Sequence, residues 1–303
     1  MKQNLFSRDF TLVVIGQIIS LLGNATIRFA LPLYLLNQTG SSALYGTVMA
    51  CAFIPAILLS PIGGVVADRV NKRNIMVILD FFTAAVILGF SLLMGNVNLV
   101  VLLTVTMMLL YGIAGAYQPS VQASIPALVS SEHFMEANSI INTISSFANL
   151  IGPVLGGMLY SAYGLKMVLL LCMVCFFLSA VMELFIRIPF VKQASRGGIL
   201  KMVNGDFRES FQFIRKEKPQ IGRVTLVVCE INLFLSAMII VAVPYLVTEV
   251  LNLGSDSMAN TLYSFSQGAL AAGGLTGGIL AGVFGKRLSV GKAGGLIAAA
   301  AFA

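Results

Sequence analysis

Long apolar runs, each followed by a short polar segment, succeed one another along the chain. A membrane-spanning helix needs about 20 consecutive, predominantly apolar residues, and eight of the runs reach that length. The pattern therefore predicts eight full transmembrane helices and part of a ninth. The predicted spans are 10–36, 43–67, 74–95, 98–121, 137–162, 166–188, 223–251 and 258–284, with the partial helix from 293 onward.

The composition also indicates that lipid, and not water, surrounds most of the chain. Hydrophobic residues make up 58% of the chain and charged residues only 10%, whereas a soluble domain carries about 25% charged residues. The 29 glycines suit helices that pack closely in lipid, where small residues let backbones approach. We therefore expect an all-α integral membrane protein.

The positive charge is distributed unevenly across this topology. Of 19 Lys and Arg residues, all but Arg28 and Lys166 fall in segments on one side of the predicted membrane. Because cytoplasmic loops carry the excess of Lys and Arg, the N-terminus is predicted to be cytoplasmic. The same bias explains the net charge of +7, so no nucleic-acid partner is expected.

An internal repeat divides the chain. Residues 63–73, GGVVADRVNKR, recur in weakened form as residues 277–287, GGILAGVFGKR. The two copies are six predicted helices apart, an even number, so both have the same orientation and form parallel repeats. The expected domains are a six-helix N-terminal domain (1–188), a basic cytoplasmic linker with an amphipathic helix near 206–216 (189–222) and a partial C-terminal domain (223–303). We expect three further helices to be missing from the second repeat.

These motifs resemble those of a known transporter family. Gly64, Asp68, Arg69, Lys72 and Arg73 resemble the signature loop between helices 2 and 3 of the major facilitator superfamily. The helix-5 motif at Gly152, Pro153, Gly156 and Gly157 is similar to that of antiporters and drug exporters in that family. Residues 118–129 resemble its bacterial macrolide-efflux branch.

The resemblance implies a function. It implies a secondary transporter in the bacterial cell membrane that exports an amphipathic, macrolide-like small molecule by alternating access, through proton antiport. An importer or proton symporter with the same fold is the alternative, and a membrane-embedded sensor or enzyme is a more distant one. The expected partners are the substrate, protons and membrane lipids. No cofactor is expected, and the protein is expected to be a monomer.

The signature loop is a candidate gate. Gly63 and Gly64 would let helix 2 approach a neighbour, and Asp68 would pair with nearby basic residues to hold the cytoplasmic face closed. Asp80 is expected to join the same cluster because it lies near the cytoplasmic end of its helix. The predicted gate set is Gly64, Asp68, Arg69, Lys72, Arg73 and Asp80. The alternative is that the basic residues only set the topology.

Two polar faces predict a substrate cavity. Gln17, Ser20, Asn24 and Arg28 recur on one face of the first helix, and Asn232 and Ser236 share a face of the helix at 223–251. A polar face within lipid should turn toward the bundle interior. Arg28 would bind an anionic substrate group or pair with an acid or, alternatively, extend to the outer interface.

Three further expectations concern packing and charge. The helix-5 glycines should pack against the glycine-rich helix at 258–284, as part of substrate coupling or as generic close packing. Glu183 should pair with Arg187, four residues along one helix face, and Glu230 is a candidate proton carrier. The sole histidine, His133, cannot form a usual zinc site, so no metal site is predicted.

Overall fold

The computed structural model describes residues 5–188, 199–251 and 256–284, and its elements there are helices joined by short connections. The long helices are α1 (Arg8–Thr39), α2 (Ser42–Arg69), α3 (Lys72–Leu93), α4 (Leu99–Leu128), α5 (Phe134–Tyr163), α6 (Leu165–Leu184), α7 (Ile199–Lys216), α8 (Pro219–Tyr245) and α9 (Asp256–Phe284). A short 3-10 helix (Ser131–His133) precedes α5, and a π-helix (Leu246–Val250) follows α8.

The predicted membrane helices are confirmed where the structure describes them. Seven of the described helices, α1 to α6 and α8, are long and apolar enough to cross a membrane. The helix predicted at 258–284 is α9, of 29 residues, and the partial helix predicted from residue 293 lies outside the described residues. An apolar segment in lipid must satisfy its backbone hydrogen bonds internally, which explains why the apolar runs predict the helices so directly.

Local sequence signals set several helix ends. The side chains of Ser7, Ser41, Asn71 and Asn98 accept hydrogen bonds from main-chain N–H groups in the first turns of α1, α2, α3 and α4. Such caps satisfy N–H groups that have no partner within the helix. Gly40 ends α1 with a φ of 60°, a left-handed conformation that glycine adopts without a steric cost.

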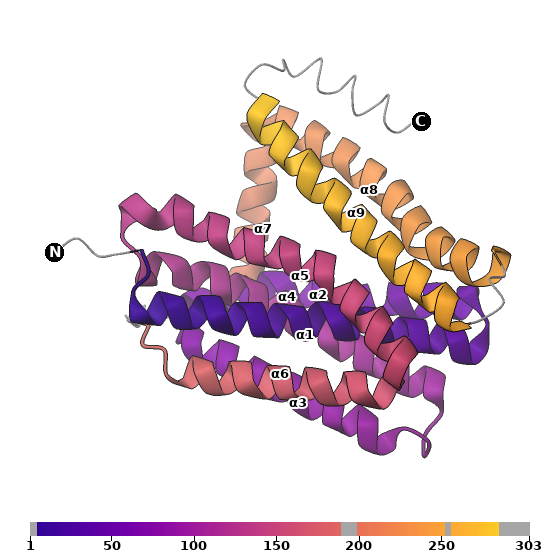
Figure 1. Ribbon diagram of the computed structural model, residues 1–303. Helices are drawn as coiled ribbons and strands as arrows, with labels where there is room; N and C mark the ends of the chain where they lie inside the picture. The colour runs from indigo at the N-terminus through magenta and orange to yellow at the C-terminus, as the bar shows by residue number, and fades with distance from the viewer. Residues whose placement is uncertain (1–4, 189–198, 252–255, 285–303) are drawn as a thin grey trace.

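Figure 1 shows α1 to α6 running side by side as one bundle. The closest pairs include α2 with α4, α1 with α5 and α6, and α3 with α6. The helices α8 and α9 approach this bundle at one end, where α9 begins, and diverge from it toward the end of α9 (Figure 1). The helix α7 crosses the direction of the bundle helices, and its position confirms the helix predicted around residues 206–216.

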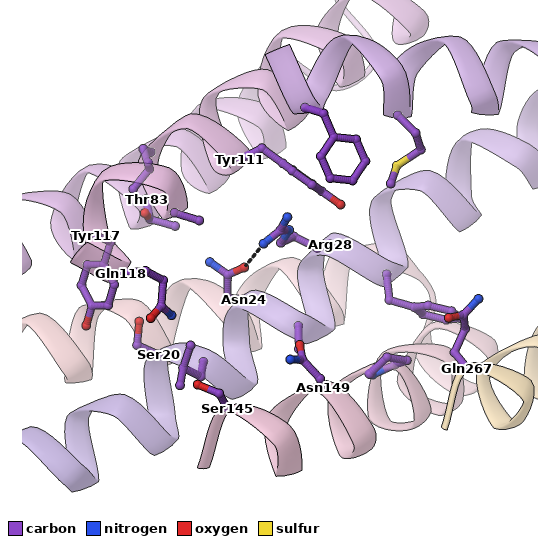
Figure 2. Close-up of a pocket in the computed structure, with 18 of the residues that line it drawn as sticks. Ser20, Asn24, Arg28, Thr83, Tyr111, Tyr117, Gln118, Ser145, Asn149 and Gln267 are labelled. Atoms are coloured by element: carbon purple, nitrogen blue, oxygen red, sulfur yellow. Dashed lines mark hydrogen bonds between the residues drawn. The ribbon is translucent and has the colours of Figure 1, made fainter. Parts of the chain in front are cut away.

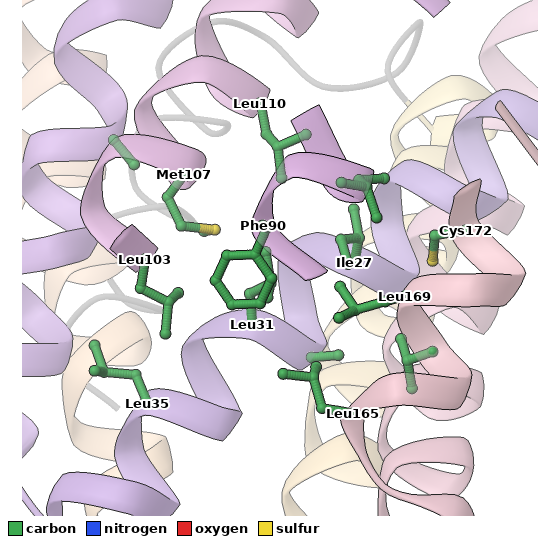
Figure 3. Close-up of a cluster of buried hydrophobic side chains, with 14 of the residues drawn as sticks. Ile27, Leu31, Leu35, Phe90, Leu103, Met107, Leu110, Leu165, Leu169 and Cys172 are labelled. Carbon is green, nitrogen blue, oxygen red and sulfur yellow. The ribbon is translucent and has the colours of Figure 1, made fainter. Parts of the chain in front are cut away.

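The main apolar cluster lies inside the bundle. Phe90 of α3 is 1% exposed and sits among side chains of α1, α4 and α6 (Figure 3). Its labelled neighbours include Ile27, Leu31, Leu103 and Leu169. Many apolar side chains on the outside of the bundle are also exposed, as expected where lipid rather than water surrounds the protein.

Glycine brings α2 and α4 into contact. A Cβ atom added at Gly63 would lie 2.6 Å from Ala116 Cα, and one added at Gly115 would lie 2.9 Å from the main-chain oxygen of Ala56. The expectation that Gly64 also mediates close approach is wrong, because a Cβ atom there would meet no atom within 4 Å. The close approach of α2 is therefore made by Gly63.

The helix-5 glycines serve two interfaces. Gly157 of α5 lies against Ser264 of α9, and a Cβ atom on Gly268 of α9 would be 2.9 Å from Val154 Cγ2. These contacts confirm the predicted packing of α5 on the helix at 258–284. Gly152 and Gly156, however, face α1 rather than α9; a Cβ atom on Gly156 would lie 3.0 Å from the main-chain oxygen of Thr26. The helix-5 motif thus packs α5 between α1 and α9.

Candidate functional site

A cavity of about 400 Å³ opens between the α1–α6 bundle and α9. Polar side chains from six helices contribute to its wall (Figure 2). They are Ser20, Asn24 and Arg28 of α1, Tyr45 of α2, Asp80 and Thr83 of α3, Tyr111, Tyr117 and Gln118 of α4, Ser145 and Asn149 of α5, and Tyr263 and Gln267 of α9. The volume is within the range of about 300–1,000 Å³ typical of small-molecule sites.

Arg28 lies inside this cavity. Its Cζ atom is 3.4 Å from the centroid of the Tyr111 ring, and its Nη1 donates to Asn24 Oδ1 at 3.4 Å. The ring face offers electron density to the cation, so Tyr111 and Asn24 together hold the guanidinium in place. Of the two positions predicted for Arg28, the structure shows the one that faces the cavity (Figure 2).

The polar face of α1 continues beyond the cavity. Ser20, Asn24 and Arg28 line the cavity, whereas Gln17 is fully buried and donates through Nε2 to the Tyr117 hydroxyl at 2.6 Å. The Tyr117 hydroxyl in turn donates to Glu183 Oε1 at 2.7 Å. The predicted stripe is therefore one continuous polar face, of which only part reaches the cavity.

The assignment of Asp80 to the gate was wrong. Asp80 is 2% exposed, lines the cavity and accepts a hydrogen bond from the Ser20 hydroxyl at 3.0 Å. It lies eight residues into α3, about two turns from the loop. The predicted ion pair between Glu183 and Arg187 is also not formed, because the Glu183 carboxylate turns inward to Tyr117.

Aromatic side chains form part of the cavity wall. The Tyr263 ring of α9 stacks on Phe29 of α1, with ring centroids 4.9 Å apart. The hydroxyls of Tyr263 and Tyr45 are 3.1 Å apart and share a hydrogen bond. Phe53 packs edge-on against Tyr111 at 5.0 Å. These rings combine an apolar wall with a few polar groups, which suits an amphipathic ligand.

Of the polar face predicted on the helix at 223–251, Asn232 is not among the described residues that line this cavity. Asn232 is exposed and its Nδ2 donates to the Val228 main-chain oxygen of its own helix at 2.9 Å. Glu230 is exposed as well, and the side chain of Ser236 lies outside the described residues. Instead, α8 contributes Ile240 to the cavity wall.

The loop residues occupy a separate region. Arg73 donates through Nε to the main-chain oxygen of Glu183 at 3.3 Å, and through Nη2 to that of Leu184. It thereby satisfies main-chain oxygens at the C-terminal end of α6, where a cation is favourable. Lys72 begins α3, Arg69 ends α2, and the side chain of Asp68 lies outside the described residues.

Sequence reasoning missed several cavity residues. Tyr45, Tyr263, Asn149 and Gln267 belong to no motif, and Gln118 belongs to the 118–129 segment but was not predicted to line a cavity; each becomes a wall residue only through the packing of its helix. Helical periodicity could have placed Tyr263 and Gln267 on one face of α9 because they are four residues apart. Within the part of the chain that the structure describes, no group of three metal-ligating side chains occurs.

The fold and cavity define a multi-pass membrane transporter. Residues 13–303 match the Major Facilitator Superfamily, and the chain belongs to this family. The family-level resemblance predicted from the sequence is thus confirmed, and the chain is a transporter rather than an enzyme.

The chain is also similar to individual transporters of known name. The chain is 24% identical over 290 residues to macrolide efflux protein A of Streptococcus pyogenes, covering 94% of this chain and 69% of that protein. It is 29% identical over 197 residues to multidrug resistance protein MdtG of Enterobacter lignolyticus, covering 63% of this chain and 46% of that protein. A solved D-xylose-proton symporter shares its fold, with a TM-score of 0.65 at 13% identity over 92% of this chain and 69% of the symporter.

Proposed function

We propose that this protein exports an amphipathic, macrolide-like small molecule across the bacterial cell membrane by alternating access, in exchange for protons. The observation that carries the proposal is the mixed lining of the cavity, which combines Arg28 and amide side chains with aromatic rings. Relatives named for macrolide efflux and multidrug resistance support a substrate of this kind.

The relative positions of the helices support alternating access. The contacts of Tyr263 with Phe29 and Tyr45 hold α9 to the bundle near the beginning of α9. Further along α9, Cβ atoms added at Gly273 and Gly274 would meet no atom within 4 Å. With a cytoplasmic N-terminus, as the distribution of Lys and Arg predicts, the separated ends face the cytoplasm. This arrangement corresponds to an inward-open state.

The loop after α2 remains our proposed gate. Asp68, Arg69 and Lys72 lie at the end where α9 separates from the bundle, and they would close that end when the two halves rock together. Asp68→Asn should leave membrane insertion intact and reduce transport. Unchanged transport by a normally inserted Asp68→Asn protein would contradict the gate.

A susceptibility test addresses the main proposal. The transporter, expressed from its natural gene in a bacterial host lacking its own drug pumps, should raise the inhibitory concentrations of macrolides. A proton uncoupler should abolish the intracellular depletion of a labelled macrolide. No change in susceptibility to any compound of a broad drug panel would remove the support for export.

Import by proton symport is the second candidate. The fold shared with the D-xylose-proton symporter motivates it. The two candidates differ in the direction of transport: a symporter would increase accumulation of its substrate in energised cells, whereas an exporter would decrease it.

A further inference from the structure

A buried polar cluster lies beside the cavity, where α1, α3, α4 and α6 meet. Gln17, Asp80 and Glu183 are 0%, 2% and 0% exposed. Hydrogen bonds join Ser20 to Asp80 at 3.0 Å, Gln17 to Tyr117 at 2.6 Å and Tyr117 to Glu183 at 2.7 Å. The carboxyl groups of Asp80 and Glu183 are close enough to interact electrostatically. Four helices of the bundle thus bring two acids into one enclosed site.

Three oxygen atoms of this cluster have no hydrogen-bond donor. They are Gln17 Oε1, Asp80 Oδ2 and Glu183 Oε2, each buried and without a partner. The hydroxyl of Ser179, which also lies beside Asp80, donates to the Gly16 main-chain oxygen at 3.1 Å instead. Buried polar groups without partners are rare in native structures and call for an unseen proton, ion or water.

The nearby basic residues are engaged elsewhere. Arg28 lies over Tyr111 and bonds to Asn24, while Arg73 binds main-chain oxygens of Glu183 and Leu184. Among the residues that the structure describes, the salt-bridge contact is between His133 and Glu136, at 2.9 Å, and it involves neither Asp80 nor Glu183. Within the described part of the chain, Asp80 accepts a hydrogen bond from the Ser20 hydroxyl and Glu183 accepts one from the Tyr117 hydroxyl, and neither carboxyl group forms a salt bridge.

Two ionised carboxylates cannot share a site of this kind at low cost. Burial of an unpaired charge is strongly unfavourable, and an ionised carboxylate can only accept hydrogen bonds. We propose that Asp80 and Glu183 form a proton-binding pair that takes up and releases the coupling proton. The step is a proton transfer from hydronium: one O–H bond of H3O⁺ breaks and leaves H2O, while a carboxylate oxygen forms the new O–H bond of a neutral carboxyl group. On release that O–H bond breaks and the proton passes to a water molecule, which becomes H3O⁺.

A proton fits the cluster better than a metal ion. The O–H of a protonated carboxyl group supplies the donor that the orphan oxygens lack. Hard metal cations such as Ca²⁺ and Mg²⁺ take about six or more oxygen ligands, whereas the described cluster leaves three oxygens unpartnered. The site is therefore assigned to H⁺.

The pair communicates with the cavity through α1. Ser20, which binds Asp80, and Arg28, which faces the cavity, share one face of α1 and are eight residues apart, about 12 Å along the axis. Asp80 itself is among the residues that line the cavity, although it is 2% exposed. Substrate at Arg28 and the proton at Asp80 act on the same helix, which provides a physical basis for coupling. This inference rests on the proposed proton-coupled function.

Infrared spectroscopy tests proton binding without a substrate. The purified transporter should show the C=O stretch of a protonated carboxyl group at neutral pH, and the band should disappear as pH is raised. Asp80→Asn and Glu183→Gln should each remove or shift this band. The matched control is Glu136→Gln, which removes an exposed acid far from the cluster and should leave the band unchanged. A band absent at neutral pH, or unaffected by both cluster variants, would overturn the proposal.

A measurement of thermal stability with added sodium distinguishes binding of Na⁺ from binding of H⁺. NaCl added at constant pH, with choline chloride as the control for ionic strength, should not raise the melting temperature of the wild-type protein. Stabilisation by NaCl that is lost in Asp80→Asn would make the cluster a sodium site and overturn the assignment to H⁺.

Transport in proteoliposomes then tests coupling, with erythromycin as the probe. Asp80→Asn and Glu183→Gln should lose erythromycin accumulation driven by a pH gradient but retain exchange of erythromycin across the membrane without a gradient. Equal pH-driven accumulation by wild type and both variants would contradict the coupling role. If wild type neither accumulates nor exchanges erythromycin, the proposed export fails, while the infrared result still decides proton binding.

Discussion

The Arg28 guanidinium lies over the ring of Tyr111, with 3.4 Å between Cζ and the ring centroid. The two residues belong to different helices, α1 and α4, and both line the cavity. The contact keeps a charged side chain within the membrane-spanning bundle without an acidic partner among the described residues. Arg28 therefore remains available to an anionic or strongly polar group of a ligand.

The first prediction concerns this contact. Tyr111→Leu should weaken macrolide binding and lower thermal stability, because it removes a cation–π interaction worth about 0.5–2 kcal/mol. Tyr111→Phe is the matched control, since it keeps the ring face and should behave nearly as wild type. Binding measured by scintillation proximity would show the difference. Equal loss in both variants would mean that the hydroxyl, not the ring, matters.

The second prediction concerns the interface of α5 with α9. Gly157→Ala should reduce transport, because the added Cβ atom would collide with Ser264. Ser264→Gly in the same protein should restore activity, since it removes the atom that is struck. Gly89→Ala is the control, because a Cβ atom there meets nothing within 4 Å. Transport by Gly157→Ala equal to wild type would argue against a tight interface.

The third prediction concerns the link between Tyr45 and Tyr263, whose hydroxyls are 3.1 Å apart. A double-mutant cycle with Phe at each position should give a coupling energy of about 1 kcal/mol, because each single change removes the same hydrogen bond. Thermal unfolding in detergent measures the stability of each variant. The reactivity of a cysteine introduced near the cavity measures how far α9 separates from α2. Strictly additive effects would show that the two hydroxyls do not interact.

The fourth prediction separates Arg73 from its neighbour. Arg73→Ala should lower the melting temperature, because it leaves main-chain oxygens at the end of α6 without the donors that Arg73 supplies. Lys72→Ala is the control and should change the melting temperature little. Arg73→Lys should recover only part of the stability, since an ammonium lacks the guanidinium fork. Equal melting temperatures for the two alanine variants would contradict a stabilising role for Arg73.

Much of the fold follows from the apolar pattern. In lipid, each apolar run of sufficient length must form a helix, so the predicted spans match α1 to α6 and α8 closely. Ser20, Asn24 and Arg28, which were predicted to share one face of the first helix, all line the cavity, because helical periodicity fixes which residues share a face. The same reasoning failed for Asn232, since a shared face does not reveal which neighbour that face meets.

The failures on Asp80 and Glu183 have one cause. The prediction for Asp80 rests on its position near the cytoplasmic end of its helix, and that for Glu183 on its four-residue spacing from Arg187; neither signal shows which neighbouring helix the side chain meets. The structure turns both inward, toward Ser20 and Tyr117. Contacts between residues 60 and 66 positions apart in the chain leave no local signal in the sequence.

The sequence by itself determined that this is a helical membrane protein with a duplicated loop motif, because hydrophobicity and charge act segment by segment. Only the tertiary structure decided that Gly152 and Gly156 pack on α1 while Gly157 packs on α9, and that Arg28 faces Tyr111. It also decided that two acids on α3 and α6 meet around Tyr117. These contacts between helices depend on how each helix is rotated about its axis and which helices it packs against. The sequence of a single helix does not specify either.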